Sequence, residues 1–77
     1  MKNETALLMQ ELVEQQRSKL LVCARRIVPN ATSDDILQPN DFPQLENHPH
    51  FRYEEGILDG LQVAQAALLR AEREARG

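Results

Sequence analysis

The chain has 77 residues, a net charge of −3 and a single cysteine, so it is one domain at most and has no internal disulfide. A domain of this size buries only about 60–65% of the surface that its unfolded chain exposes, so we expect it to need a further source of stability. The N-terminus lacks the apolar stretch of a signal peptide and no apolar run approaches the roughly 20 residues of a membrane span, which predicts a cytoplasmic protein.

The first predicted element is a long helix over residues 4–28. Its apolar residues recur at steps of four and three, the spacing of one helical face. That face consists of Met9, Val13, Gln16, Leu20, Cys23 and Ile27. Pro29 ends the helix, because proline has no backbone N–H and its ring clashes with the preceding turn. We interpret Cys23, between Val22 and Ala24, as a small apolar residue of the core.

The second predicted element is a proline-rich connection over residues 29–48. It carries four acidic and no basic residues, yet it is too apolar for a free linker. Its apolar residues are Ile36, Leu37, Phe42 and Leu45. We therefore expect an ordered crossover with one or two short helical turns, the first of them begun by Thr32 or Ser33.

The third predicted element is a second long helix over residues 49–75, because proline suits the first helical position and Pro49 stands there. Phe51 and Tyr53 are expected to lie against the crossover. A stripe at steps of four and three predicts the packing face. The stripe consists of Ile57, Leu61, Ala64, Leu68 and Ala71. Gly56 and Gly60 lie beside it, and each costs about 1 kcal/mol of helix stability relative to alanine.

These elements predict an all-α fold, in which two long antiparallel helices form a hairpin joined by the ordered crossover, and residues 1–77 are one domain. The second helix has apolar residues on so much of its surface that we expect two contacts, one inside the chain and one to another chain. The expected assembly is a homodimer built as a four-helix bundle. Six residues are the expected interaction surface: Leu58, Gly60, Leu61, Ala64, Leu68 and Leu69.

From this surface we expect a small protein–protein interaction module, an adaptor or accessory subunit without catalysis of its own. The sequence contains no GxSxG element, phosphate-binding loop, HExxH or CxxC, so we expect no catalytic residues and no cofactor. One stretch, ENHPHFRYEEG at residues 46–56, contains two residues that could act as metal ligands. His50 and Glu54 are four residues apart on one helical face and could share a metal ion, although two ligands do not make a site.

The main alternative is a small dimeric nucleic-acid-binding regulator. Arg17, Lys19, Arg25 and Arg26 form a basic segment of the first helix that a dimer would present twice to a phosphate backbone. The acidic total charge and the lack of a known nucleic-acid-binding motif weigh against this alternative. The expected hairpin dimer resembles in architecture the plasmid Rop family of small RNA-binding bundles. No motif is shared, so the resemblance assigns no role to any residue.

Overall fold

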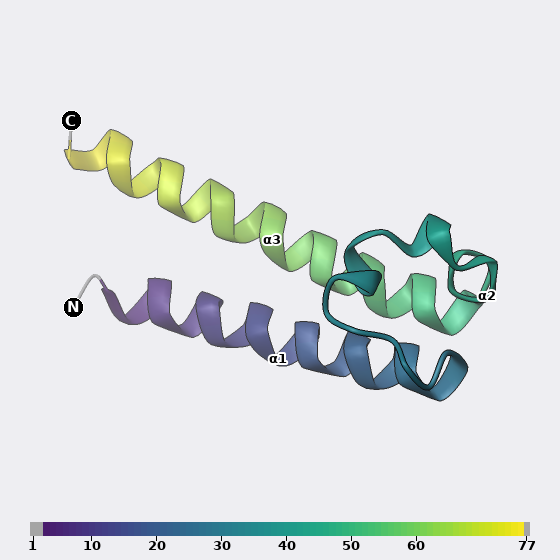
Figure 1. Cartoon of the computed structure of the whole chain (residues 1–77). Coiled ribbons are helices and arrows are strands. Elements are labelled where there is room, and N and C mark those ends of the chain that lie inside the picture. The colour runs from purple at the N-terminus through teal and green to yellow at the C-terminus, as the bar shows by residue number, and fades with distance from the viewer. Residues whose placement is uncertain (1–2, 77) are drawn as a thin grey trace.

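The computed structural model describes residues 3–76 and is built from two long antiparallel helices that lie side by side (Figure 1). The termini lie at one end of the pair and the crossover at the other. We call these the terminal end and the crossover end. The elements in chain order are α1 (Asn3–Ile27), the short 3₁₀ turns η1 (Asp35–Leu37) and η2 (Pro39–Asp41), α2 (Pro43–Glu46) and α3 (Pro49–Arg76). The predicted all-α hairpin is confirmed, and each long helix begins and ends within one residue of its expected bounds.

Both long helices carry charged residues, and the longest uncharged run in α3 is residues 60–69. Between residues 3 and 76, no helix has the length and the apolar character needed to cross a membrane. This finding agrees with the short apolar runs of the sequence.

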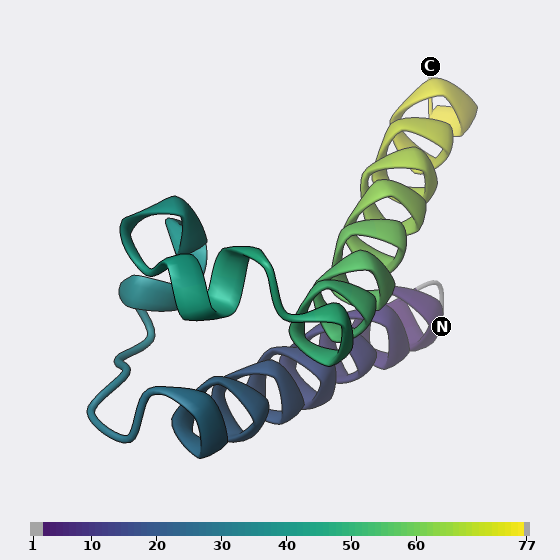
Figure 2. The same ribbon diagram turned by 90° about the vertical axis from the view of Figure 1, so that its right-hand side faces the viewer.

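The crossover is ordered by its own hydrogen bonds, as expected. Thr32 Oγ1 accepts a hydrogen bond from the Asp35 N–H at 3.3 Å, and Asp35 Oδ2 accepts one from the Thr32 N–H at 2.9 Å. This reciprocal pair closes the turn that leads into η1. The next two turns, η2 and α2, each begin at a proline, whose fixed φ suits a first helical position. Figure 2 shows the resulting group of turns folded against one side of the helix pair.

The hydrophobic core lies at the crossover end, where the crossover and both long helices meet. Its largest fully buried side chains are Leu20 of α1, Leu45 of α2 and Phe51 of α3. The other residues of this core cluster are Val13, Cys23, Ala24, Ala31, Ile36 and Leu58. No residue from Glu4 to Leu12 is buried, and none is buried from Asp59 to Arg76. The terminal halves of the two helices therefore lie beside each other without a core of their own.

The face of α3 that meets α1 differs from the predicted one. The inward line passes through Phe51 and Leu58, which are 0% and 6% exposed, whereas Ile57 and Ala64 are exposed. The predicted stripe is thus rotated to one side of the contact, and Leu61 is the half-buried residue that joins the two lines. The expectation that Tyr53 packs on the crossover was wrong: its side chain is 66% exposed, because two helical positions past Phe51 are about 200° around the axis.

The two crossover leucines test this core directly. Leu45 is 0% exposed and Leu37 is 69% exposed, although both belong to the crossover and both are truncated by the same substitution. We expect Leu45→Ala to lower the free energy of unfolding by about 2–5 kcal/mol, from lost burial and the cavity left behind. Leu37→Ala should change it by about 0.5 kcal/mol or less. Urea unfolding followed by circular dichroism measures both values, and equal losses would contradict the described position of the crossover.

Candidate functional site

A polar side chain sits at the centre of the contact between α1 and α3. Gln16 belongs to the apolar face of α1, and among the described residues it is the one polar side chain in the buried set, at 6% exposed. Its Nε2 donates to the backbone oxygen of Glu54 at 3.0 Å and to Glu54 Oε1 at 2.7 Å. A buried amide needs such partners, because leaving it unpaired would cost about 1–3 kcal/mol. The contact therefore fixes which turn of α3 faces Gln16.

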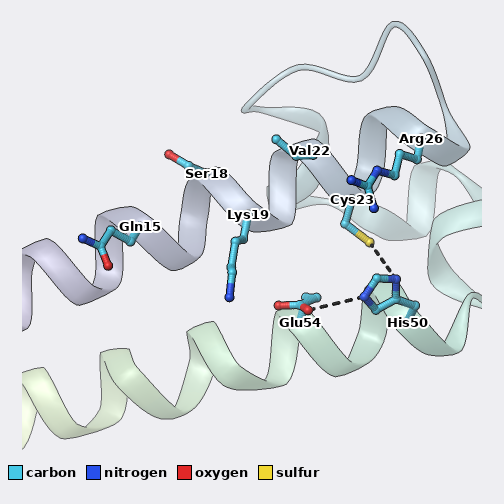
Figure 3. Close-up of a pocket in the computed structure, with 8 residues that line it drawn as sticks. All are labelled: Gln15, Ser18, Lys19, Val22, Cys23, Arg26, His50 and Glu54. Carbon is cyan, nitrogen blue, oxygen red and sulfur yellow. Dashed lines mark hydrogen bonds and ion pairs between the residues drawn. The ribbon is translucent and has the colours of Figure 1, made fainter.

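His50 continues this line of polar contacts one helical turn away. Its Nε2 lies 3.4 Å from Glu54 Oε2, and its Nδ1 lies 3.8 Å from the sulfur of Cys23 (Figure 3). Both contacts are satisfied when Nε2 carries the proton, so that it donates to the carboxylate while Nδ1 accepts from the thiol. Thiol, imidazole and carboxylate thus form a continuous chain across the two helices.

The neighbouring groups hold the Glu54 carboxyl and the Cys23 thiol in opposite protonation states. The hydrogen bond from Gln16 is the main cause that lowers the pKa of Glu54; His50 and Lys19 act in the same direction, and partial burial opposes them. Burial is the main cause that raises the pKa of Cys23, the negative charge of Glu54 adds to it, and Arg26 opposes it. At neutral pH the carboxyl is therefore ionised and the thiol is protonated.

The geometry does not favour the metal alternative. Cys23 and Glu54 contact opposite nitrogens of the His50 ring, so the three groups do not converge on one point. Across residues 3–76 no group of three or more His, Cys, Asp or Glu side chains is placed to hold a metal ion. His50 and Glu54 instead contact each other directly, through Nε2 and Oε2 at 3.4 Å, four residues apart on one helix.

A groove of about 560 Å³ runs beside this polar chain between α1 and α3. Figure 3 shows its eight lining residues, which all come from the two long helices and none from the crossover. The lining residues are Gln15, Ser18, Lys19, Val22, Cys23, Arg26, His50 and Glu54. The groove therefore opens on the side of the hairpin that the crossover leaves uncovered.

The structure does not bring the four basic residues of α1 onto one surface. Lys19 and Arg26 are seven residues apart, which is close to two full turns, and both line the groove. Arg17 lies instead on the side of the crossover, beside Ser33. Arg25 is bound within the chain, since its Nε donates to the backbone oxygen of Ala31 at 2.9 Å. A phosphate backbone would meet two separate pairs of cations, which weakens the case for nucleic-acid binding.

The six residues expected to contact a partner divide between the core and the surface. Leu58 is buried inside the chain and Leu61 is packed against the core. Gly60, Ala64, Leu68 and Leu69 are exposed on α3. These four are the ones exposed in the described conformation, and Leu68 and Leu69 also line a hollow between α3 and Ala6 and Met9 of α1.

Sequence reasoning paired His50 with Glu54 but missed the contact of His50 with Cys23 and the part played by Gln16. One signal was available for Gln16: it is the only polar residue on the apolar face of α1. The groove also had a signal in the sequence. Lys19, Val22 and Arg26 follow one another at steps of three and four, which places these three groove residues on one side of the helix. The contacts themselves depend on the register between α1 and α3.

Comparison with protein-family models, with curated proteins and with solved structures finds no match to this chain.

The Glu54 contacts predict a specific dependence of stability on pH. A carboxyl whose pKa is lower in the folded state stabilises the fold above its unfolded pKa, and that contribution disappears as pH falls through the folded pKa. Glu54→Gln removes the titrating group but keeps an acceptor oxygen for Gln16. We therefore expect this variant to lose less stability than the wild type between neutral pH and about pH 3.

The control is Glu11→Gln, which removes the same charge at an exposed position of α1 outside this cluster. Urea unfolding at a series of pH values gives the slope for each protein. If the free energy of unfolding has the same slope against pH in Glu54→Gln and in Glu11→Gln, the Gln16–Glu54 contact does not cause the pH dependence of stability.

Proposed function

We propose that this protein is a small protein–protein interaction module that self-associates through α3, so that two hairpins form a four-helix bundle. The observation that carries the proposal is the missing core at the terminal end. The 18 residues of α3 from Asp59 to Arg76 contain no buried side chain.

Helices without a buried face gain little stability on their own. In proteins most helical stability comes from the packing of an apolar face and not from the helix propensity of the sequence. In this chain the packing is concentrated at the crossover end, while large apolar side chains remain exposed at the terminal end. These include Leu8 and Leu12 on α1, and Val63, Leu68 and Leu69 on α3. A second subunit that covers part of this surface supplies the missing burial.

The surface of α3 that favours a second copy is an uncharged stripe beside the intrachain contact. We call it the outer stripe, and it consists of Ile57, Gly60, Ala64, Leu68 and Ala71. Steps of three and four keep these residues on one side of the helix. Since none of them is charged, another chain can cover the stripe without burying an unpaired charge, which would be costly.

Small residues at the centre of the outer stripe allow a close approach of two helices. A Cβ atom added at Gly60 would meet nothing within 4 Å beyond its chain neighbours and the local backbone of its own helix, so no packed side chain requires a glycine there. A second copy of the same stripe is complementary to it, because small residues at the centre meet small residues and the apolar Ile57 and Leu68 flank them. This self-complementarity is typical of a two-fold interface.

A charge placed on the outer stripe tests the proposal. We expect Ala64→Glu to raise the dissociation constant of the dimer by about 100-fold or more, because the carboxylate would be buried without a partner. Sedimentation equilibrium over a concentration series measures the constant, with the dimer at twice the 8.8 kDa of one chain.

Ala66→Glu is the matched control for this experiment. Ala66 is also exposed on α3, but two positions along a helix place it about 200° from Ala64, away from the outer stripe. The control should dimerise like the wild type. A wild-type protein that remains monomeric over the whole series would refute the proposal, and so would equal weakening by both variants.

A further inference from the structure

We propose that the groove between α1 and α3 binds a small amphipathic organic anion, a molecule with an acidic group and an apolar body. The acidic group would meet Lys19 and Arg26, and the apolar body would lie over Val22 and Cys23. This site is separate from the outer stripe and does not rest on the proposed self-association.

Two free cations on one side of α1 are the first line of support, because they would bind the acidic group of the ligand. Lys19 and Arg26 both line the groove, and neither takes part in an ion pair within the part of the chain that the structure describes. Figure 3 shows Lys19 and Arg26 on α1 with Val22 and Cys23 between them, while Gln15 and Ser18 lie farther along the helix beyond Lys19. Ammonium and guanidinium groups bind carboxylate, sulfonate and phosphate oxygens through charge-assisted hydrogen bonds.

The one acidic residue of the groove is already engaged. Glu54 accepts a hydrogen bond from Gln16 at 2.7 Å and contacts His50 at 3.4 Å, and its side chain is only 15% exposed. It offsets part of the positive charge, so Lys19, Arg26 and Glu54 together leave the groove with one net positive charge when His50 is neutral. The hydrogen-bond donors that remain for a ligand include Lys19, Arg26 and the Ser18 hydroxyl, and they favour an acceptor-rich ligand.

The volume of the groove and its lining residues are the second line of support for an amphipathic ligand. A volume of about 560 Å³ lies within the range of roughly 300–1,000 Å³ that is common for small-molecule sites. Between the two cations the groove is lined by the Val22 side chain and the Cys23 sulfur, which offer no strong hydrogen bond. A fully polar anion such as inorganic phosphate would leave this surface unused, whereas an apolar body attached to the acid would cover it.

The groove and the outer stripe are centred on different parts of α3, so substitutions can test them separately. Ala64, at the centre of the stripe, follows Glu54 of the groove by ten residues, which is about 15 Å along a helix. Ile57 is the stripe residue nearest to the groove, so the variants at Ala64 and at Lys19 and Arg26 are placed away from the boundary between the two sites. The monomeric Ala64→Glu variant can also be used to measure ligand binding if the self-association proposal is correct.

Anilinonaphthalene sulfonate is a suitable probe, since it combines a sulfonate with an apolar aromatic body and fluoresces when bound. We expect Lys19→Gln/Arg26→Gln to raise its dissociation constant about tenfold or more. The matched control, Arg17→Gln/Arg70→Gln, removes the same charge from exposed positions outside the groove and should change the constant by less than about twofold. Octanoate should displace the probe at concentrations where inorganic phosphate does not.

The wild-type protein offers a second readout, because Cys23 lines the groove but is only 5% exposed, so its alkylation requires a local opening that a bound ligand opposes. Bound probe or octanoate should slow the alkylation of Cys23 by iodoacetamide at least threefold. Equal probe binding by the two double variants, or binding that leaves the alkylation rate unchanged, would overturn the inference. Binding lost in Ala64→Glu but kept in Lys19→Gln/Arg26→Gln would place the probe on the outer stripe and would also overturn it.

Discussion

The structure depends on one constraint, which is that the whole hydrophobic core is gathered at the crossover end. Leu20, Leu45 and Phe51 come from three different elements, and each is almost completely buried in the same cluster. The crossover is therefore part of the core and not only a connection between helices. Without Leu45 and Ile36, the crossover ends of α1 and α3 would expose their apolar faces as the terminal ends do.

The contact between Gln16 and Glu54 adds specificity to this core. Apolar faces at steps of three and four can slide past one another by a turn at modest cost, because leucine, valine and alanine side chains pack in several registers. A buried amide removes that freedom, since only one register supplies its acceptors. The same register brings His50 to Cys23 and places Lys19 and Arg26 along the groove. One buried polar residue thus determines the composition of the candidate site.

The sequence predicted the secondary structure of this chain better than its packing. Pro29 and Pro49 marked the ends of the long helices, and the three-and-four spacing identified their apolar faces. The orientation of α3 could not be predicted from spacing alone, because two apolar lines overlap on it and share Leu61. Which line faces α1 is decided by the burial of Phe51 together with the crossover.

The candidate site shows the same division between local and long-range information. The i,i+4 pair of His50 and Glu54 was visible in the sequence, because both residues lie on one helix. Their contacts with Gln16 and Cys23 join residues 38 and 27 positions apart in the chain. Those distances depend on the path of the crossover and on the register between α1 and α3, and no local pattern encodes either of them.

The one-sided core also implies a gradient of opening along the hairpin. Backbone amides exchange with solvent through local unfolding, and segments with few buried contacts open at low free energy. In α3 the protection of amides should decline from the turns around Phe51 and Leu58 toward Arg76, within one continuous helix. Local unfolding of the hairpin would then start at its terminal end, while the crossover end stays folded. A second subunit on the outer stripe would hold that end closed and make the gradient shallower.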